Sequence, residues 1–284
     1  MTPTAAERIL VFIPTYNCAS QIGRVLAQFA AVPPGQFERI LVLDNGSKDG
    51  TAEAAIAAAR GVQCCPVTVA RNRANYNLGG SHKAAFAYAA AQGYTHVVVL
   101  HGDDQGDIRD LLPILERGEH KRHDACLGAR FDRRSKLQGY STFRIFGNHV
   151  FNLLFSVASM RRILDLGSGL NIFARSVFAD PGIFRYADDL RFNVYLLLGL
   201  IDRGARIMFF PISWREDDQV SNVKIVSQSV KTLQILGQYA ATRSQFRSGE
   251  HRAVPHDAYT FDIIEDGPPD LTARAPTGQG VRQG

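Results

Sequence analysis

The chain has 284 residues, of which 45% are hydrophobic and 21% are charged. These proportions exclude a wholly disordered chain and allow one large domain, or a domain with an appendage. The formal net charge of +5 favours anionic partners, although charge alone does not identify them.

The basic excess is concentrated in one part of the chain. Residues 128–162 contain seven Arg or Lys side chains and a single acid, Asp132. Such a block suits phosphate groups or an anionic membrane surface, and a solvated basic face is the alternative. No nucleic-acid-binding motif accompanies the charge, so nucleic acid is not an expected partner.

Cysteine usage and the lack of targeting signals favour a cytoplasmic protein. Cys18, Cys64, Cys65 and Cys126 form no CxxC pair, which suits a reducing compartment. The first residues do not have the pattern of a signal peptide, and no uncharged stretch reaches the roughly 20 apolar residues of a spanning helix. Peripheral contact with the inner face of the cell membrane remains compatible with this pattern, and the sequence gives no oligomeric state.

Short apolar runs rich in β-branched residues recur in the first hundred positions, as expected of strands buried on both faces. Helical patterns lie between them. Ser20 is placed to cap the first helix and Asp49 the second, which runs through Arg60, while Gly80–Gln92 predicts a third. This alternation predicts an α/β fold with a mostly parallel sheet flanked by helices. The predicted strands are Ile9–Ile13, Ile40–Leu43, Val67–Val69 and Val97–Leu100.

Phe143–Met160 predicts an amphipathic helix with a polar side and an apolar side. Core packing of the apolar side is the first interpretation. The alternative is a helix that lies on a bilayer, with Arg144, Arg161 and Arg162 at its ends. The apolar side consists of Phe146, Val150, Leu153, Leu154 and Val157, and the polar side of His149, Asn152, Ser156 and Ser159.

The remainder of the chain contains fewer regular patterns. Phe192–Ile201 predicts an apolar helix, and Ile207–Pro211 predicts a further strand. From about Ser244 the sequence becomes polar and rich in Arg, Pro and Gly, so the last residues are expected to form a disordered tail.

Three polar clusters follow predicted strands at the point where each strand ends. They are Pro14 to Asn17, Asp44 to Ser47, and His101 to Gln105. In a parallel sheet the ligand crevice lies at the carboxyl ends of the strands, so these clusters should line one site. The alternative is that each cluster only forms a turn. This interpretation explains the glycines in the clusters but not the acids, because strand ends do not require acids.

The third cluster, HGDDQ, has the chemistry of a divalent metal site. Alternating residues of an extended chain point the same way, so His101, Asp103 and Gln105 could converge on one ion. Mg²⁺ and Mn²⁺ prefer carboxylate, amide and phosphate oxygens, and a nucleotide diphosphate would complete the shell. The ion would neutralise charge on a departing diphosphate.

Seven segments together resemble the family-two, inverting glycosyltransferases of the GT-A fold, and most of all the dolichol- or polyprenyl-phosphate mannose synthases. The segments occur in family order and span roughly Arg8 to Leu236. They are PTYN at 14–17, DNGSKDGT at 44–51, NLGGSHKAA at 77–85, HGDDQ at 101–105, GARF at 128–131, DLGSGLNIF at 165–173 and WREDDQVSNVK at 214–224.

The resemblance implies a role for each matching position. The donor, a GDP- or UDP-linked sugar, would be held through its base and ribose by Pro14, Tyr16, Asn17 and Asp44, with Asn45 and Asp103 also in the nucleotide site. Asp103 and Gln105 stand where the family binds Mn²⁺ or Mg²⁺. Arg130, Arg215 and Lys224 match basic positions that face donor or acceptor phosphates.

Two positions depart from the family pattern. The metal motif usually opens with an acid, and here it opens with His101, which is a poor ligand for Mg²⁺ but can bind Mn²⁺ as a neutral ring. Asn45 replaces the acid that usually follows Asp44. These departures motivate a further hypothesis, a nucleotide-binding module whose catalytic site has decayed.

Asp188 and Asp189 lie where many relatives carry a catalytic acid. A hydroxyl acceptor, such as a glycan, would need one of them as a base, whereas a lipid phosphate is already anionic and would need none. The other interpretation of this pair is an N-cap of the helix that follows.

The leading hypothesis is sugar transfer to a polyprenyl or dolichyl phosphate at the cytoplasmic membrane face. The domain is predicted to cover residues 1–243, with a nucleotide-binding part at 8–127 and an acceptor part at 128–243, and residues 244–284 form an extension. A Rossmann-type dehydrogenase is disfavoured because no GxGxxG follows the first strand.

Overall fold

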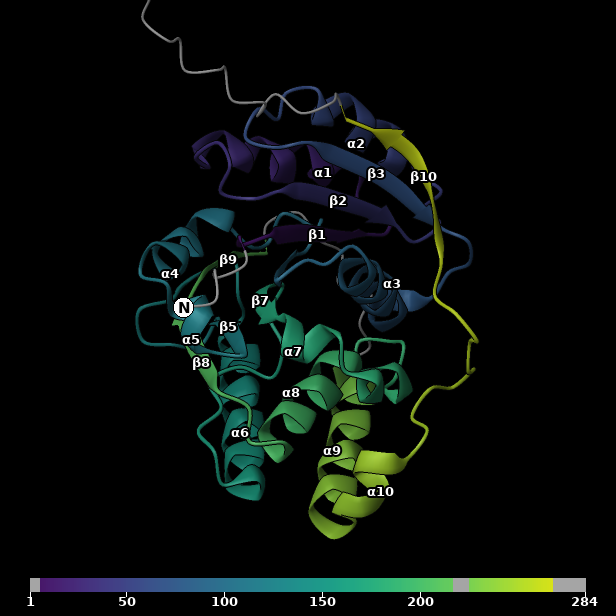
Figure 1. Cartoon of the computed structure of the whole chain (residues 1–284). Helices are drawn as coiled ribbons and strands as arrows, with labels where there is room; N and C mark the ends of the chain where they lie inside the picture. The colour runs from purple at the N-terminus through teal and green to yellow at the C-terminus, as the bar shows by residue number, and fades with distance from the viewer. Residues whose placement is uncertain (1–5, 217–224, 268–284) are drawn as a thin grey trace, which may run out of the picture.

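The computed structural model describes residues 6–216 and 225–267, and its centre is an eight-stranded mixed sheet (Figure 1). The strand order is β10-β3-β2-β1-β4-β7-β5-β8. Neighbouring strands run parallel except around β7 and at the β10 edge, where the pairing is antiparallel. The strands of this sheet are β1 (Ile9–Thr15), β2 (Arg39–Asp44), β3 (Val67–Asn72), β4 (His96–Leu100), β5 (Ala125–Ala129), β7 (Leu170–Ala174), β8 (Ile207–Pro211) and β10 (Phe261–Asp266).

Helices cover both faces of the sheet, and a separate two-stranded ribbon pairs β6 (Lys136–Gln138) with β9 (Ser213–Arg215). The helices are α1 (Ala19–Ala27), α2 (Thr51–Ala59), α3 (Asn77–Ala91), α4 (Leu112–Glu116), α5 (Glu119–Arg122), α6 (Thr142–Ser159), α7 (Arg175–Phe178), α8 (Phe192–Asp202), α9 (Ile225–Ala241) and α10 (Arg243–Ser248). Short 3₁₀ turns span Gln28–Ala31, Ile108–Asp110 and Pro181–Arg185.

Strand β1 shows why the sheet is buried on both sides. All seven of its residues are buried, and alternate side chains enter different cores. Leu10 and Phe12 pack with residues of α3 and α8, whereas Val11 and Ile13 pack with residues of α1 and α4. Because side chains alternate across a strand, a continuous apolar run fills both cores at once.

The α/β architecture and the mostly parallel sheet predicted from sequence are confirmed, and small differences occur at helix starts. Helix α1 begins at Ala19, and α3 begins at Asn77 rather than Gly80. The Asp49 carboxylate accepts hydrogen bonds from the backbone N–H groups of Thr51 and Ala19, at 3.1 and 3.0 Å. Asp49 therefore holds the first turns of α2 and α1 together.

The first interpretation of the helix at 143–160, core packing of its apolar side, is wrong. The five apolar residues that were expected in the core are exposed, while Asn152 and Ser159 on the polar side are buried. The polar side chains face inward because they bind the loop that follows the helix, as described below. Within the described residues, no helix combines the length and hydrophobicity needed to cross a bilayer.

The segment predicted as an extension beyond residue 243 adds two elements to the fold. Helix α10 buries Phe246 in the core beside α8 and α9, and β10 pairs with β3 at the edge of the sheet. The chain between them runs along one side of the molecule from the helical end to the sheet (Figure 1). We call residues 249–260 the C-terminal arm. Residues 268–284, the greater part of the predicted tail, lie outside the described ranges.

Candidate functional site

The three polar clusters meet at one edge of the sheet, as the parallel arrangement requires. Thr15 lies opposite Asp44 in the β1–β2 register, and β4 flanks β1 on its other side. The backbone N–H of Asn45 donates to the carbonyl of Thr15 at 2.9 Å, and that of Gly102 donates to the carbonyl of Pro14 at 3.1 Å. Direct hydrogen bonds thus join the second and third clusters to the first.

The first two clusters form a cradle with one exposed aromatic ring. Asp44 is fully buried, and its carboxylate accepts from the Ser47 N–H at 3.0 Å and from Arg71 Nε at 2.9 Å. Asn17 adopts a left-handed backbone, and its side chain accepts from the Lys48 N–H at 3.0 Å. Tyr16 is 53% exposed, so its ring is accessible for stacking on a base.

Asn45 organises the loop between β3 and α3. Its Oδ1 accepts from Asn72 Nδ2 and from the Tyr76 N–H, both at 2.9 Å, and its Nδ2 donates to Asn75 Oδ1 at 2.8 Å. Asparagine supplies both donors and acceptors, which an acid at this position would not do. The replacement of the usual acid by Asn45 therefore has a structural explanation.

The two acids of the third cluster have different surroundings. Asp104 is buried and tied to Arg24 Nε at 2.6 Å, to Gln28 Nε2 at 3.1 Å and to Arg215. Asp103 is half-buried, and among the described contacts its carboxylate accepts from the Gln105 N–H at 3.2 Å. Burial, reinforced by the charge of Asp104, raises the pKa of Asp103 to about 6.

His101, two residues before Asp103, has a ring that is held in the uncharged form. Its Nε2 is buried without a hydrogen-bond partner among the described residues. Burial, with the nearby positive charge of Arg130, lowers the pKa of His101 to about 4. Gly169 is required beside this ring, because a Cβ there would lie 2.8 Å from His101 Cγ.

These side chains suit a metal ion whose remaining coordination positions are filled by a bound substrate. No group of three or more His, Cys, Asp and Glu side chains gathers for metal binding in the described part of the chain. Mg²⁺ and Mn²⁺ are, however, often held by one or two carboxylates with substrate phosphates. Asp103 offers a carboxylate of this kind and His101 an unpaired ring nitrogen, and metal binding by Asp103, His101 and Gln105 stays a prediction.

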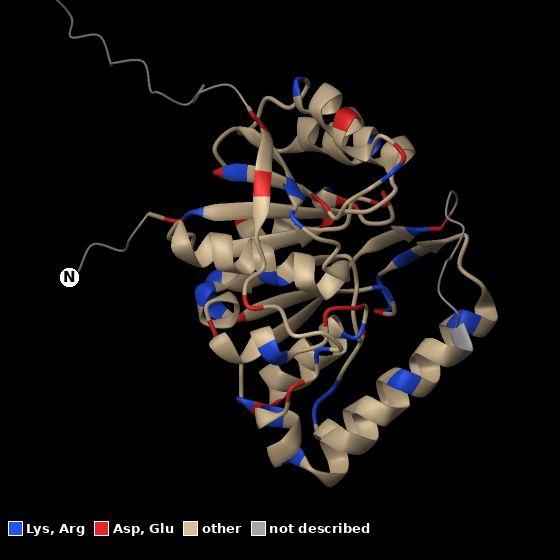
Figure 2. Ribbon diagram, turned by 90° about the vertical axis from the view of Figure 1, so that its right-hand side faces the viewer, with Lys and Arg blue, Asp and Glu red and all other residues tan. Residues whose placement is uncertain are grey.

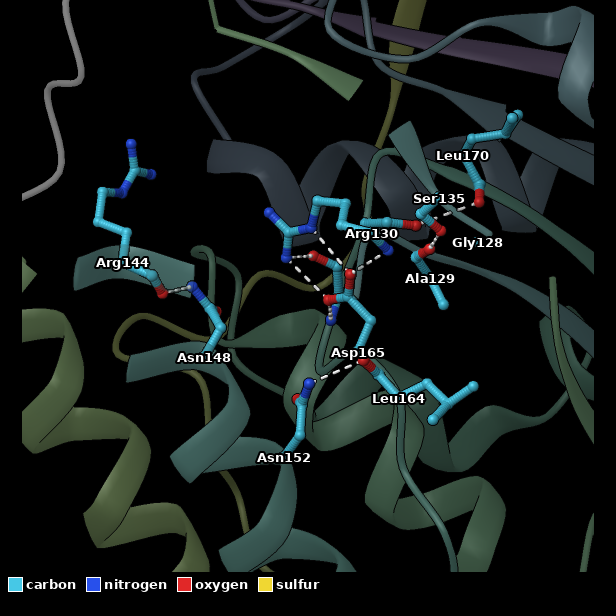
Figure 3. Close-up of polar contacts among 12 residues, drawn as sticks. Gly128, Ala129, Arg130, Ser135, Arg144, Asn148, Asn152, Leu164, Asp165 and Leu170 are labelled. Carbon is cyan, nitrogen blue, oxygen red and sulfur yellow. Dashed lines mark hydrogen bonds and ion pairs between the residues drawn. The ribbon is translucent and has the colours of Figure 1, made fainter. Parts of the chain in front are cut away.

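Arg130, whose charge acts on both His101 and Asp103, is held in place by Asp165 (Figure 3). Its Nε and one terminal nitrogen each donate to the Asp165 carboxylate at 2.8 Å, and the terminal nitrogen also donates to the Gly167 carbonyl at 2.9 Å. Burial alone would lower the pKa of Arg130, but the Asp165 charge outweighs it, and the pKa is raised. The guanidinium also lies over the Trp214 ring at 5.1 Å.

The other two predicted phosphate-binding cations have different outcomes. Arg215 donates from Nε to the Asp104 carbonyl at 2.9 Å and pairs with the Asp104 carboxylate, so it lies at the third cluster. Lys224 lies outside the described residues. The phosphate contacts of Arg130, Arg215 and Lys224 therefore remain predictions.

Asp188 and Asp189 are adjacent in sequence but have different partners. Asp188 is buried, and its Oδ1 accepts from Lys83 Nζ at 2.6 Å and from the Tyr259 hydroxyl at 2.7 Å. Asp189 is half-exposed and pairs with Arg191 Nε at 2.8 Å. Burial opposes ionisation of Asp189, but the hydrogen bonds from Arg191 prevail and lower its pKa.

Lys83, a residue of α3, holds the loop that carries Asp188 against this helix. Its side chain has no exposed surface, and Nζ also donates to the Tyr186 carbonyl. The Asp188 carbonyl in turn accepts from the Gly79 and Gly80 N–H groups at 2.6 and 3.2 Å. Burial lowers the pKa of Lys83 to about 8, although Asp188 opposes this effect.

Sequence reasoning missed three of these residues as parts of the site: Lys83, Asp165 and Tyr259. Lys83 and Asp165 stand within the segments NLGGSHKAA and DLGSGLNIF, whose resemblance was the available signal. Tyr259 had no comparable signal, because it reaches Asp188 from the C-terminal arm.

Replacing Tyr259 with Phe should lower the free energy of unfolding by about 1.5–3 kcal/mol, because a hydrogen bond to a buried charged group is lost while the ring remains. Urea denaturation would measure the change. Tyr140→Phe, in which the ring of a half-buried tyrosine is also kept, serves as the control and should cost less. Equal effects of the two substitutions would show that the Tyr259–Asp188 contact adds nothing to stability.

The sequence and the fold both match known proteins. The profile of the family described as Glycosyl transferase family 2 matches residues 10–180. A polyprenol monophosphomannose synthase of Mycolicibacterium smegmatis is 24% identical over 216 residues, which cover 76% of this chain and 80% of that protein. An undecaprenyl-phosphate 4-deoxy-4-formamido-L-arabinose transferase of Pseudomonas paraeruginosa is 28% identical over 62% of this chain, but the match spans only 50% of its own length.

Among solved structures, a glucosyl-3-phosphoglycerate synthase of Mycobacterium tuberculosis, in complex with Mn²⁺, UDP and glucosyl-3-phosphoglycerate, superposes with a TM-score of 0.54. The two proteins are 18% identical, and the match covers 93% of this chain and 91% of the other. At this identity the similarity concerns the fold.

Proposed function

The chain belongs to glycosyl transferase family 2, and from that premise we propose that it transfers a sugar, with inversion, from a nucleoside diphosphate sugar to a polyprenyl phosphate. The observation that carries the proposal is the meeting of the three polar clusters at one edge of the sheet. The cradle around Asp44 and the exposed ring of Tyr16 suit a nucleotide. Asp44 ends β2 and Asp103 follows β4, and these two strands flank β1 on opposite sides. The similar solved structure, which contains UDP and Mn²⁺, supports a nucleoside diphosphate sugar as the donor and a divalent metal ion.

Within this proposal, Asp103 would hold Mn²⁺ or Mg²⁺, with His101 favouring Mn²⁺ because a neutral imidazole suits it better. The bound ion would supply charge neutralisation for the leaving diphosphate. The protein's own residues do the remaining work. Asp44 and Asn17 shape the nucleotide cradle, while Arg130 and Arg215 contribute positive charge at the third cluster.

The acceptor proposal rests on the chemistry of the transfer and on the names of two relatives. An acceptor phosphate oxygen attacks the anomeric carbon opposite the diphosphate, so that a new carbon–oxygen bond forms as the old one breaks and the nucleoside diphosphate departs. A lipid phosphate is already anionic and needs no strong base. The names of the two relatives described above refer to undecaprenyl phosphate and to a polyprenol monophosphate sugar, which supports a polyprenyl phosphate as the acceptor.

Thermal shift with nucleotides tests the donor proposal. UDP or GDP with Mn²⁺ should raise the melting temperature by about 5 °C or more at saturating ligand, because binding to the folded state alone stabilises it by mass action. The cognate nucleotide sugar should behave in the same way, and omission of Mn²⁺ should reduce the shift. The absence of a shift with every nucleoside diphosphate would contradict nucleotide binding.

A second assay separates transfer from mere binding. Labelled nucleotide sugars would be incubated with undecaprenyl phosphate in detergent, and the label that enters the organic phase would be counted. Label in the lipid supports the proposed function. Tight nucleotide binding with no transfer to lipid, and none to glycan acceptors, would favour a binding module instead.

A further inference from the structure

Helix α6 turns its apolar side to solvent. Six large apolar residues recur at intervals of three and four along the helix and its C-cap, so they form one continuous stripe. Their exposed fractions run from 38% at Val150 to 81% at Met160. Exposed apolar stripes of this length on soluble proteins mark interaction sites. The stripe consists of Phe143, Phe146, Val150, Leu153, Val157 and Met160.

The opposite side of α6 is held to the protein by polar contacts. Asn152 Nδ2 donates to the Leu164 carbonyl at 2.7 Å, and the Ser156 hydroxyl accepts from the Ile163 N–H at 2.9 Å. Phe155 fills the adjoining core. Rotation of the helix to bury the stripe would break these hydrogen bonds and leave their polar groups without partners. The outward orientation of the stripe is therefore stabilised by the fold.

Basic side chains predominate around the stripe, although Glu216 pairs with Arg144 of the helix. Residues 142–162 contain no acid, and Arg161 and Arg162 are exposed directly after the C-cap. Arg133 and Lys136 are exposed on the segment that precedes the helix. The long helix at the lower right of Figure 2 is α9, which packs against α6 and contains Lys231 and no acid. An apolar stripe with a basic end complements an anionic lipid surface.

The same helix is connected to the candidate site (Figure 3). Asn152 binds the carbonyl of Leu164, and the next residue, Asp165, holds the Arg130 guanidinium. One side of α6 thus faces solvent with apolar groups, while its other side supports the loop that positions Arg130. A membrane against the stripe would lie beside the part of the site that carries this charge.

We propose that the stripe of α6, together with Arg161 and Arg162, is a docking surface for an anionic bilayer. The helix would lie in the plane of the interface with its apolar side among the acyl chains and its basic end at the headgroups. This inference deepens the proposed function by naming the surface that meets the acceptor's membrane. Docking itself requires no transfer, so the two can be tested separately.

Co-sedimentation with vesicles tests the proposal. The full chain should bind vesicles of phosphatidylglycerol mixed with phosphatidylcholine, and added salt should weaken the binding. Phe146→Asp/Leu153→Asp/Val157→Asp should reduce the bound fraction about tenfold or more. Val254→Asp, at an exposed apolar residue on the C-terminal arm, is the matched control and should bind like the unaltered chain. Unaltered melting temperatures would show that the variants are folded.

Arg161→Gln/Arg162→Gln tests the charge component and should weaken binding to the anionic vesicles only. Equal binding of the unaltered chain to pure phosphatidylcholine, or equal binding of the triple variant, would overturn the proposal. So would a dimer that the triple variant dissociates in the absence of vesicle binding, since the stripe would then join two copies of the chain.

A water-soluble, short-chain polyprenyl phosphate distinguishes docking from transfer. The triple variant should glycosylate it at the rate of the unaltered chain. Vesicle binding without transfer to any lipid phosphate would leave the docking surface intact and refute the acceptor proposal. Transfer without vesicle binding would refute the docking surface alone.

Discussion

Replacing Asp103 with Asn should lower kcat/KM by about 100-fold or more, because removal of one group that stabilises transition-state charge commonly costs this much. Asp103 is the acid of the third cluster that is not neutralised by an arginine among the described contacts, whereas Asp104 is held by Arg24 and Arg215. The experiment is a transfer assay across a range of Mn²⁺ concentrations. The variant should also lose the Mn²⁺-dependent part of the nucleotide thermal shift.

Asp107→Asn provides the control in the same loop. Asp107 pairs with Arg109 and was not predicted to bind donor or metal, so its substitution should change activity little. Equal losses in the two variants would indicate a general disturbance of the loop. Full activity of Asp103→Asn at every Mn²⁺ concentration would refute the role of this carboxylate.

The raised pKa of Asp103 gives the same prediction a pH dependence. Since burial raises the pKa to about 6, the free carboxyl group becomes protonated as the pH falls through this value. A protonated carboxyl group is not a metal ligand, so the affinity for Mn²⁺ should fall below this pH and be constant well above it. Titration of Mn²⁺ in the presence of nucleotide, above and below pH 6, would measure the effect. Affinity that does not change across this range would contradict it.

Replacing Asp188 with Asn should lower the free energy of unfolding by about 3–5 kcal/mol, because the change leaves the Lys83 ammonium buried without its carboxylate. Lys83 has no exposed surface and Asp188 Oδ1 lies 2.6 Å from its Nζ. Urea denaturation would measure the loss. A second substitution, Lys83→Met, should recover part of it, because the unpaired charge is removed.

The control for this prediction is an ion pair on the surface. Asp262 pairs with Arg73, and both side chains are largely exposed. Asp262→Asn should therefore cost far less than Asp188→Asn. A loss of similar size in Asp262→Asn and Asp188→Asn, or a double variant no more stable than the single one, would refute the buried-pair argument.

Asp189→Asn distinguishes the two classes of acceptor. Asp189 and Arg191 form a partly exposed ion pair, so the substitution should have a small effect on the free energy of unfolding. If a glycan hydroxyl is the acceptor and Asp189 is the base, turnover should nearly vanish. If a lipid phosphate is the acceptor, turnover should be retained, since no base is needed. Full activity in both the Asp188 and Asp189 variants would eliminate base catalysis by this pair.

The part of the site at the strand ends was predictable because two simple features of the sequence determine it. Buried apolar runs identify the strands, and parallel order places their carboxyl ends together. The hydrogen bonds that join Asn45 to Thr15 and Gly102 to Pro14 confirm that the predicted clusters meet. The sequence could not show that Asn45 is occupied by loop contacts, or that Asp104 rather than Asp103 pairs with arginines, because those partners lie far away along the chain.

The sequence left the orientation of α6 open for a related reason. Periodicity shows that a helix has two sides but does not say which side meets the protein. That choice depends on the loop after the helix, where the carbonyl of Leu164 and the N–H of Ile163 need polar partners. Strand β10 gave no signal because three acids, Asp262, Glu265 and Asp266, leave it without the continuous apolar run of a buried strand.

The pairing of β10 with β3 has a consequence for synthesis of the chain. β3 emerges early from the ribosome, but the strand that covers its outer edge comes from residues 261–266. Throughout elongation this edge therefore offers unpaired backbone groups to any neighbouring nascent chain. Translation that stops before residue 261 would leave the edge permanently open, so truncated products are expected to aggregate even when their central strands have folded.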